Sequence, residues 1–499
     1  MSTFVVAAIF GLILYTIFCL VIGLGIGYKK EAVSTSKGYF LGGGIGRFVL
    51  LFTTAATWFS AAVFQGNIGQ VYNSGIGWAV FGTWQFLTVI CICAIGPRLW
   101  CMSTVRGHIT PGDLVGDYYR SKLFKFIIGV GFACFAVPTM MGQMTAMGWA
   151  IETLTLGAIP FWGGLLYVTV VTCMYSFFGG FRSQAWVDTS QGILFTAIIW
   201  GSLLMVISTG GGSLSAVTAR VNETFPDAFL YTPAGEAGAF PVQRSLSFFL
   251  LNGLGGFFAP YCWQRSQAAK RGSDLIKNGQ VAMLLFALGI ALPVTLIGMY
   301  SHAIPIEGLQ ASNAERVLTL FSAQYAPYWG IVVTVGILAA GMSTTSSIMV
   351  ATSSIVAVDI VKLAKSDIGD SSIKNWGKGA IIALNIVAFL LALRGFNSVI
   401  FLVNIAVGGF IQISIPVLGI FAFKRMTKWG AMTGFIGGLL CTYLFQIEMG
   451  NPWGVWGGVW GLLCNAVICI VISAFTKPID LAWRESFLRP LTIHSNSKL

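Results

Sequence analysis

Charged residues are scarce in this sequence. Asp, Glu, Lys and Arg make up 9% of the 499 residues, against about 25% in an ordinary soluble domain. So few charges cannot cover a water-soluble surface, and 56% of the residues are hydrophobic, with a mean hydropathy of +0.81. This composition excludes a soluble globular enzyme, a disordered protein and a conventional nucleic-acid-binding protein. We therefore expect a polytopic membrane protein that is embedded in the lipid bilayer.

The residue types that build metal centres and nucleophilic sites are few or scattered. The three histidines, His108, His302 and His494, lie far apart in the sequence, so a catalytic metal cluster is not expected. The ten cysteines lie in or beside apolar runs and form no CxxC motif, which is typical of core residues. Since no nucleophile–base pair is found either, the sequence predicts neither an enzyme nor a bound organic cofactor.

Apolar segments long enough to cross a bilayer follow one another along the whole chain. About thirteen are predicted, at residues 5–27, 46–73, 78–104, 126–150, 161–180, 190–209, 246–263, 280–303, 328–358, 377–396, 398–423, 430–448 and 455–475. The first segment is too long for the apolar region of a signal peptide, and no basic residue precedes it. The sequence thus predicts an all-α polytopic membrane protein with no separate soluble domain.

Lys and Arg set the expected orientation. Residues 1–4 carry none, whereas Lys29, Lys30 and Lys37 follow the first segment. Basic residues accumulate in cytoplasmic loops, so the N-terminus is expected outside and the C-terminus in the cytoplasm, in the plasma (inner) membrane. Only four of the 29 basic residues then fall outside, which leaves 25 in or beside cytoplasmic loops. One such cytoplasmic group is predicted to consist of Arg265, Lys270, Arg271 and Lys277.

The second segment, 46–73, is unusually polar for a membrane helix. Small and hydroxylated residues such as Ala56, Thr57 and Ser60 stand at its centre, and Gln65 follows them. Backbone can leave helical geometry at membrane depth only where protein or a cavity satisfies it. An unwound stretch near 56–60 would free carbonyls to bind a cation, but close packing of small residues in a buried helix explains this segment about equally well.

The segment 328–358 is rich in hydroxyl groups. They belong to Ser343, Thr344, Thr345, Ser346, Ser347, Thr352, Ser353 and Ser354. Positions 343, 346, 347, 350 and 354 share one helical face, which is expected to look toward a polar interior. Hard cations such as Na⁺ prefer oxygen ligands, so two hydroxyls with carbonyls from this helix and from 46–73 would make a five-oxygen cage. Hydroxyls that bond back to their own helix explain so dense a run less well.

Four windows of the sequence resemble the sodium:solute symporter family. They are YFLGGG at 39–44, ATWFSA at 56–61, GGFRSQAWVDTSQG at 179–192 and AAGMSTTSSIMVATSSIVAVDI at 339–360. The resemblance implies a LeuT-like fold in one domain, 1–499, made of two inverted five-helix repeats, helices 2–6 and 7–11, each with a broken first helix. The parts are then an extra helix at 5–27, the repeats at 46–209 and 246–423, and two C-terminal helices at 430–475.

The resemblance also implies a function. A secondary active symporter would couple inward Na⁺ movement to uptake of a small organic solute by alternating access, acting as a monomer. The solute would be a carboxylate, a vitamin or an amino-acid-like molecule, and Na⁺ would be the coupling ion with no other cofactor. A proton-coupled symporter and a sodium-independent channel or facilitator are the alternatives.

Positions that match the family's sodium site can be named. The carbonyls of Ala56, Phe59 and Ala340 and the hydroxyls of Ser343 and Thr344 are expected to bind Na⁺. Asp188 matches the aspartate that the family links to sodium release on the cytoplasmic side. From the residues alone, Asp188 lies at the start of the sixth segment, where an aspartate would cap a helix well, and both roles can hold.

Solute contacts are expected from polar or aromatic side chains that face inward near the middle of the membrane. The candidates are Trp58, Gln65, Gln143, Asn252, Phe257 and Asn404. For each of them the alternative is hydrogen bonding between helices or core packing. The stretch NGLGGFFAP from Asn252 is expected to break the seventh helix, because Gly and Pro disrupt the helical ladder.

The same positions separate two branches of the family. Trp58 stands where proline permeases carry an acidic residue, and Asn252 and Gly256 replace their Trp and Tyr, while Pro260 is retained. The resemblance therefore argues against proline and points toward the pantothenate branch.

Overall fold

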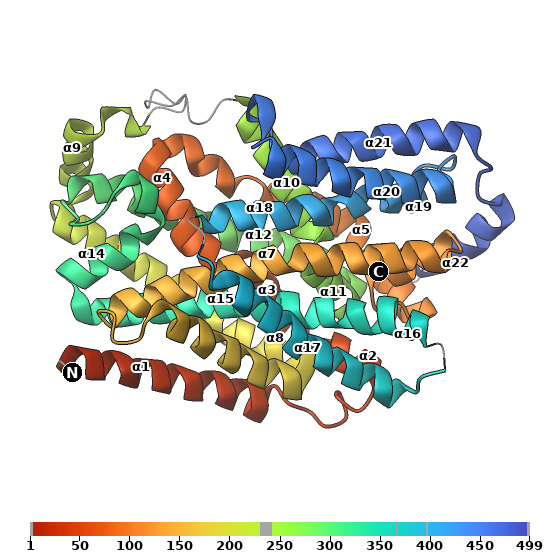
Figure 1. Cartoon of the computed structure of the whole chain (residues 1–499), viewed down its shortest axis with the longest axis horizontal. Helices are drawn as coiled ribbons and strands as arrows, with labels where there is room; N and C mark the ends of the chain where they lie inside the picture. Colours follow the sequence, from red (N-terminus) through yellow and green to blue (C-terminus); the bar gives the residue numbers. More distant parts are fainter. Residues whose placement is uncertain (1–2, 230–241, 366, 396–397, 497–499) are drawn as a thin grey trace.

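The computed structural model describes residues 3–229, 242–365, 367–395 and 398–496. Within these residues every regular element is a helix, and one isolated backbone bridge joins Ile45 to Ala269. The predicted all-α class is therefore confirmed. The long helices lie side by side along the horizontal axis of Figure 1.

The principal helices are α1 (Thr3–Leu20), α3 (Arg47–Trp58), α4 (Ile68–Ser74), α5 (Gln85–Arg106), α7 (Lys122–Leu154), α8 (Phe161–Gly210), α10 (Val242–Phe258), α11 (Pro260–Ala268), α12 (Gly272–Phe286), α13 (Leu292–Tyr300), α15 (Pro327–Ile355), α17 (Asp370–Ala392), α18 (Val399–Phe410), α19 (Ser414–Phe421), α20 (Lys428–Tyr443) and α21 (Gly457–Phe475). Further elements lie between them: α2 (Ser36–Leu41), η2 (Ala62–Asn67), α6 (Pro111–Tyr118), α9 (Leu214–Thr224), η7 (Ala311–Arg316), α14 (Val317–Tyr325), η8 (Val356–Val361) and α16 (Lys362–Ala364). The helix α22 (Leu481–Asn496) follows α21.

Ten helical runs in the described residues are long and apolar enough to cross a membrane. The predicted segments 161–180 and 190–209 both lie in α8, which Gly180 (φ 58°, ψ −154°) divides into two helices. A Cβ at Gly180 would lie 2.4 Å from the Tyr39 carbonyl oxygen, so only glycine fits this bend. The predicted segments 46–73 and 246–263 are interrupted by breaks, and the count of thirteen stays a prediction.

The first break lies at the end of α3. This helix stops at Trp58, Phe59 takes φ −87° and ψ 59°, and the π-helical turn η2 begins at Ala62. The predicted interruption near 56–60 is therefore confirmed, and it falls at the C-terminal end of that range.

The second break separates α10 from α11. Ala259 is extended (φ −58°, ψ 141°) and Pro260 is the first residue of α11. The residue before a proline is driven out of the helical region, so the predicted break in NGLGGFFAP is confirmed and has this local cause.

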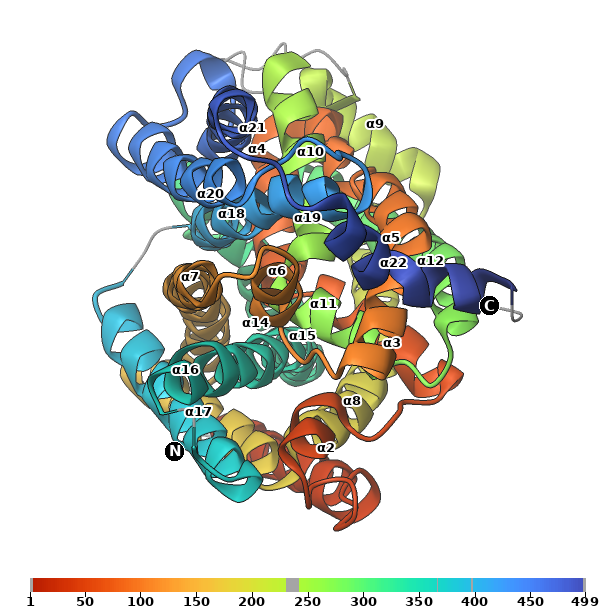
Figure 2. The same cartoon turned by 90° about the vertical axis from the view of Figure 1, so that its right-hand side faces the viewer.

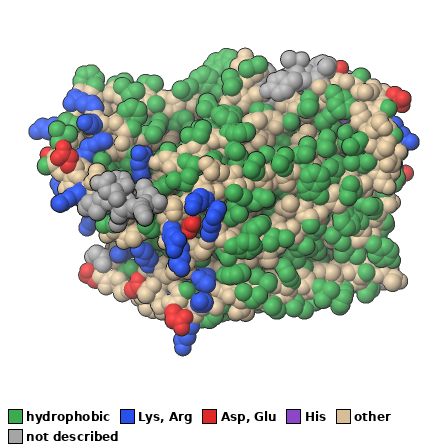
Figure 3. All heavy atoms as spheres, turned by 180° about the vertical axis from the view of Figure 1, so that it is seen from behind, with side chains coloured by type: hydrophobic (Ala, Val, Ile, Leu, Met, Phe, Trp, Pro, Cys, Tyr) green, Lys and Arg blue, Asp and Glu red, His purple; other side chains and the backbone are tan. Residues whose placement is uncertain are grey.

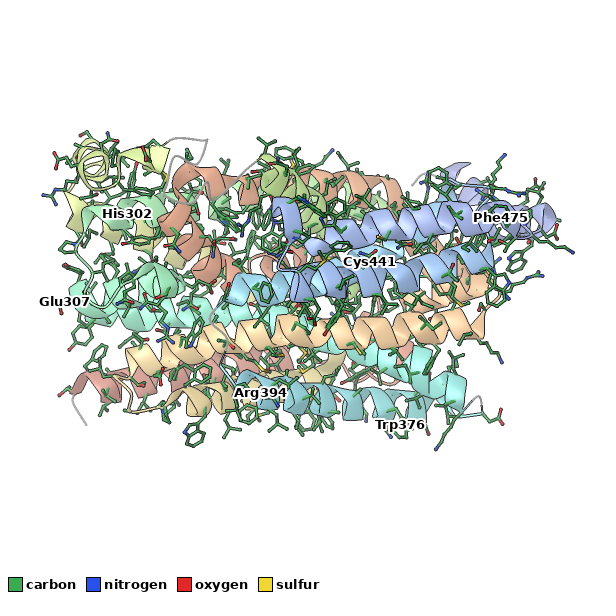
Figure 4. The ribbon with its side chains drawn as sticks, turned by 45° about the horizontal axis from the view of Figure 1, so that its top comes forward. His302, Glu307, Trp376, Arg394, Cys441 and Phe475 are labelled. Atoms are coloured by element: carbon green, nitrogen blue, oxygen red, sulfur yellow. The ribbon has the colours of Figure 1, made fainter. Side chains whose placement is uncertain are left out.

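The two ends of the helix bundle carry different parts of the chain. Figure 4 shows His302 and Glu307 at one end and Phe475 toward the other. Viewed along the helices, α11 and α15 lie near the middle of the bundle, with α5, α7, α8 and α12 around them (Figure 2). The broken helices and the hydroxyl-rich α15 thus meet in the interior, where polar groups must find partners in the protein.

Candidate sodium site and solute cavity

Two hydroxyls of α15 reach the carbonyls at the end of α3. Ser343 Oγ lies 3.1 Å from the Ala56 carbonyl oxygen, and Thr344 Oγ1 lies 3.2 Å from that of Thr57. Both hydroxyls also donate to the Ala340 carbonyl, at 2.9 and 3.2 Å. Five uncharged oxygens therefore converge at the break in α3, a donor set that suits Na⁺.

Four of the five predicted sodium-binding residues meet in this cluster. Among the described residues, no hydrogen bond joins the Phe59 carbonyl to Ser343 or Thr344, and the Phe59 ring packs against Phe195 and Phe286. The carbonyl of Thr57 takes part instead, and the sequence analysis did not choose it. The cause is local, because α3 continues helically to Trp58 and turns away at Phe59.

Back-bonding is common among the hydroxyls of α15. Seven of the eight bond to a carbonyl of their own helix, and Thr352 Oγ1 has no partner in the described structure. The alternative interpretation, that these hydroxyls bond back to their own helix, is thus correct for most of the run. Ser343, Thr344 and Ser347 differ because each makes a second contact across to another helix.

A buried ion pair lies beside the inner part of this face. Arg265 Nη2 of α11 donates to Asp188 Oδ2 of α8 at 2.9 Å, and Asp188 and Arg265 are 0% and 2% exposed. Arg265 Nη2 also donates to the hydroxyls of Thr53 and Ser347, each at 2.8 Å. Gln184 Nε2 donates to the same Asp188 oxygen.

Two predictions about this pair are wrong. Asp188 is not a helix cap at a hydrated membrane edge, because α8 bends at Gly180 and residue 188 lies inside the helix that follows, fully buried. Arg265 does not belong to the cytoplasmic group predicted for it, because it lies in α11, all of whose side chains are buried, and is itself 2% exposed. An arginine inside an apolar helix is a functional signal, but the predicted segment ended two residues before it.

Ser347 connects the ion pair with the oxygen cluster. It lies one helical turn after Ser343, and its Oγ is 3.2 Å from Thr57 Oγ1. Its hydroxyl therefore contacts α3 on one side and Arg265 on the other. A continuous row of polar groups leads from Ser343 to Asp188.

A cavity opens next to the oxygen cluster. Its walls come from α3, α7, α10, α11, α15 and α18, the turn η2 and Trp84 just before α5, and Thr344 lines it. Four of the predicted solute contacts lie in its walls, namely Trp58, Gln143, Asn252 and Asn404. The lining residues are Thr57, Trp58, Ser60, Ala62, Val63, Asn67, Trp84, Thr139, Gln143, Phe248, Asn252, Gly256, Tyr261, Thr344, Ile400, Val403, Asn404 and Val407, with no charged side chain among them.

Gln65 and Phe257 lie outside this cavity. Both are buried, Gln65 in η2 and Phe257 against Phe258. The predicted solute role is therefore not supported for either residue. The spacing of an α-helix could not predict that Gln65 points away from the cavity. Gln65 lies in η2, whose π-helical turn rotates its side chains relative to those of an α-helix.

Three donor groups in the cavity have no partner in the described structure. They are Gln143 Nε2, Asn404 Nδ2 and Thr139 Oγ1. Gln143 Oε1 accepts from the Ala61 amide at 2.9 Å, which can only donate, so Nε2 must face away from it. Gln143 thereby satisfies a backbone group freed by the break in α3.

The orientation of Asn404 is fixed in a similar way. Asn252 Nδ2 lies 3.3 Å from the Phe248 carbonyl, which can only accept, and 3.3 Å from Asn404 Oδ1. Asn404 Nδ2 is therefore left as a donor. Buried donors are normally paired, and these three unpaired donors all belong to residues that line the cavity.

Aromatic side chains form another part of the wall. Trp58 and Trp84 meet edge to face with ring centroids 5.8 Å apart, and Trp58 Nε1 donates to the Gly256 carbonyl at 3.3 Å. Their own polar groups are turned away or paired, which leaves ring surface for an apolar part of a solute.

The turn η7 reaches the cavity wall from the end of the bundle that carries His302. Glu315 of η7 accepts from Ser398 Oγ and from the Val399 amide, each at 2.9 Å, at the start of α18. Ile400, which follows, lines the cavity. This contact was not predicted, because Glu315 lies between the predicted segments 280–303 and 328–358.

Comparison with known proteins agrees with this geometry. The model of the sodium:solute symporter family matches residues 39–438. The sodium/pantothenate symporter of Haemophilus influenzae is 29% identical over 81% of this chain and 82% of its own. The high-affinity proline transporter PutP of Bacillus subtilis is 30% identical over 92% and 96%.

A solved structure extends the comparison to the fold. A Na⁺-coupled sialic acid symporter, in a substrate-bound outward-open state, superposes with a TM-score of 0.79 at 18% identity and covers 96% of this chain and 99% of its own. The likeness confirms the predicted LeuT-like helical fold, whereas the repeat boundaries stay a prediction. On the family match and the identity over nine-tenths of its length, the chain belongs to the sodium:solute symporter family.

Proposed function

We propose that this protein couples the inward movement of Na⁺ to the uptake of a small organic solute. The observation that carries the proposal is Thr344, whose hydroxyl belongs to the oxygen cluster at the break in α3 and also lines the cavity. An ion bound at the cluster therefore touches the wall of the solute cavity. Each ligand then raises the affinity for the other, and the two effects are equal by linkage.

The row of polar groups from Ser343 to Asp188 gives the ion a way out. In this proposal Na⁺ passes Ser347 and displaces Arg265 from the Asp188 carboxylate on release. Asp188 acts as a transient partner rather than as a member of the binding cluster. In this proposal Na⁺ is released on the cytoplasmic side of the plasma (inner) membrane, and the N-terminus lies outside. The protein works as a monomer.

The cavity also favours one kind of solute. The free N–H groups of Gln143 and Asn404 and the hydroxyl of Thr139 are arranged for hydrogen-bond acceptors, and no carboxylate lines the cavity to receive an ammonium group. We propose a solute with a carboxylate or carbonyl at one end and an apolar part that packs on Trp58 and Trp84. The sodium/pantothenate relative fits this chemistry better than the proline relatives.

The test uses purified protein in proteoliposomes. Monocarboxylates with an apolar body, their amides, the matching primary amines and amino acids are each offered with Na⁺ or with choline outside. Na⁺-driven accumulation of the carboxylates, and little of the amines, is expected. Equal accumulation in choline with a pH gradient alone would assign the coupling to protons, and accumulation without any ion gradient would indicate a facilitator.

Gln143→Glu tests the solute end of the cavity. The variant keeps the oxygen that accepts from the Ala61 amide but replaces the free donor with a negative charge. Binding of a carboxylate is expected to weaken roughly 10- to 100-fold, since a hydrogen bond to a charged group is lost, while Na⁺ binding is retained. Unchanged carboxylate affinity would show that the solute binds elsewhere in the cavity.

A further inference from the structure

A basic pocket lies where the first helix ends. Its walls come from the residues after α1, from α8 and from the start of α17, and they carry Lys30, Lys374 and Lys378 beside the apolar side chains of Leu24 and Phe178. No Asp or Glu is among its described lining residues. The pocket shares no lining residue with the solute cavity.

The three lysines lack an acidic partner in the part of the chain that the structure describes. None of them takes part in a salt bridge there. Lys374 and Lys378 are one helical turn apart, so their charges repel each other. An anion between them would remove this repulsion.

Two of the ammonium groups are held in place by the protein. Lys374 Nζ donates to the carbonyls of Val33 and Ser34, at 3.2 Å each. Lys378 Nζ lies 5.0 Å from the centroid of the Phe177 ring. Basic residues at the cytoplasmic ends of helices are expected in any membrane protein. Lys270, Arg271 and Lys277 are exposed, whereas Lys374 and Lys378 are partly buried in the wall of the pocket.

The surroundings place the pocket at the boundary between lipid and water. Phe178 is 52% exposed and Trp376 is 48% exposed, and large aromatic side chains gather at membrane interfaces. Figure 3 shows hydrophobic side chains over most of one face of the molecule, with Lys and Arg gathered toward one end. Trp376 is labelled in Figure 4, on the lower edge of the bundle.

We propose that this pocket binds the phosphate headgroup of an anionic phospholipid, such as phosphatidylglycerol, between Lys30, Lys374 and Lys378. The acyl chains lie along Leu24 and Phe178. Basic pockets between membrane helices have the chemistry for such headgroups, and the apolar half of this one has no use in binding free phosphate. The lipid would bridge the first helix and α17.

Native mass spectrometry of the full-length protein tests the site. The detergent-purified protein is titrated with phosphatidylglycerol, phosphatidylcholine of the same acyl chains, or inorganic phosphate. Preferential retention of phosphatidylglycerol is expected. Each lysine near an anionic headgroup contributes about a fivefold factor, so the triple variant Lys30→Gln, Lys374→Gln, Lys378→Gln should bind it on the order of a hundredfold more weakly.

Two control variants show whether the pocket itself, and not the overall positive charge of the protein, binds the lipid. Lys270→Gln, Arg271→Gln, Lys277→Gln removes as much charge at the predicted same membrane side and should leave binding unchanged, and the triple Lys→Arg variant of the pocket should retain it. If the triple Gln variant fails to fold, Lys30→Gln, Lys378→Gln spares the contacts of Lys374 and should still lose more than tenfold. Equal loss in pocket and control variants, or equal occupancy by inorganic phosphate, would overturn the proposal.

Discussion

Arg265 Nη2 and Asp188 Oδ2 are 2.9 Å apart in a position where neither side chain meets solvent. Burying two charges is costly, and their attraction offsets that cost only when the remaining hydrogen bonds are made. Thr53, Gln184 and Ser347 supply them around Oδ2, whereas Asp188 Oδ1 has no partner in the described structure. A buried ion pair adds little to the free energy of unfolding. In the proposed release step it separates when Na⁺ replaces the Arg265 guanidinium beside the Asp188 carboxylate.

Asp188→Asn is therefore expected to be more harmful than loss of a helix cap. The variant leaves the Arg265 guanidinium buried without its counter-charge, which costs about 3–5 kcal/mol. We expect a clear fall in thermal stability in detergent and low expression. A helix cap would predict a near-normal protein, since Asn caps about as well as Asp.

The double variant Asp188→Asn, Arg265→Gln separates stability from ion release. Removal of both charges should restore much of the stability, because replacing a buried pair is often tolerated. Net uptake should stay slow while Na⁺ and solute binding persist, as measured by stopped-flow turnover in proteoliposomes. Turnover at the wild-type rate would remove Asp188 from the release path.

Ser343→Ala and Thr344→Ala should differ in a specific way. Each removes one oxygen of about five, so the Na⁺ concentration for half-maximal uptake should rise on the order of tenfold. Thr344→Ala should also weaken solute binding measured at saturating Na⁺, because only Thr344 lines the cavity. Ser353→Ala is the control, because the Ser353 hydroxyl donates to the Val350 carbonyl of its own helix. An equal effect of this control would mean that the hydroxyls of the cluster serve helix packing and do not bind Na⁺.

Glu315 should hold the cavity closed at the end of the bundle that carries η7. Glu315→Ala leaves the Val399 amide and Ser398 hydroxyl without their acceptor, a loss of about 1 kcal/mol by analogy with helix caps. A cysteine introduced at Val403, in the cavity wall, should then react faster with a membrane-impermeant thiol reagent added outside. An unchanged rate would mean that η7 does not control access.

The same contact predicts a pH effect. Burial raises the pKa of Glu315 above its ordinary value, although the bonds from Val399 and Ser398 act in the opposite direction. The carboxylate therefore takes up a proton at a higher pH than an exposed glutamate, and the protonated group loses one acceptor. Acidification lowers the reactive thiolate fraction in both proteins, so the labelling rate at 403 relative to that of Glu315→Gln should rise as the outside pH falls. A ratio that does not change with pH would contradict this.

The membrane potential should act on transport of neutral or zwitterionic solutes. The oxygen cluster contains no carboxylate, so each Na⁺ carries one net charge across the membrane, worth about 2.3 kcal/mol per 100 mV. Solid-supported membrane recordings should show an inward current with such solutes. A monocarboxylate carried with a single Na⁺ should give almost none, and a current of the same size would indicate further ions.

Local chemistry explains how much of the fold could be predicted. The prolines and glycines near Pro260 predicted the second break, because backbone geometry depends on neighbouring residues. The small and polar residues around Thr57 fitted a break and close packing about equally well. The pairing of α3 with α15 was predicted from the hydroxyl groups and free carbonyls of the two segments, and the resemblance only named the individual positions. The hydroxyl run of α15 could not by itself distinguish back-bonding from a shared site, since the second contact of Ser343 comes from a residue 287 positions away.

The site residues that escaped prediction depend on tertiary contacts. Arg265 stands two residues beyond an apolar run, so a topology based on charges assigns it to a loop. In the structure it lies in α11, after the break at Ala259, and pairs with Asp188. Thr139 lies one helical turn before Gln143 and could have been found by asking which polar residues share its face. The sequence around Glu315 does not indicate its role, because its carboxylate accepts hydrogen bonds from the start of a helix more than 80 positions away.

Direct measurement of ²²Na⁺ binding tests the central claim without knowledge of the solute. Purified protein should bind Na⁺ saturably, and the double variant Ser343→Ala, Thr344→Ala should lose that binding at concentrations that saturate the unchanged protein. The control Ser346→Ala, Ser353→Ala should keep it, since both hydroxyls donate to carbonyls of α15 and neither belongs to the oxygen cluster. Equal Na⁺ binding by the double variant and the control would contradict the assignment of the sodium site to the break in α3.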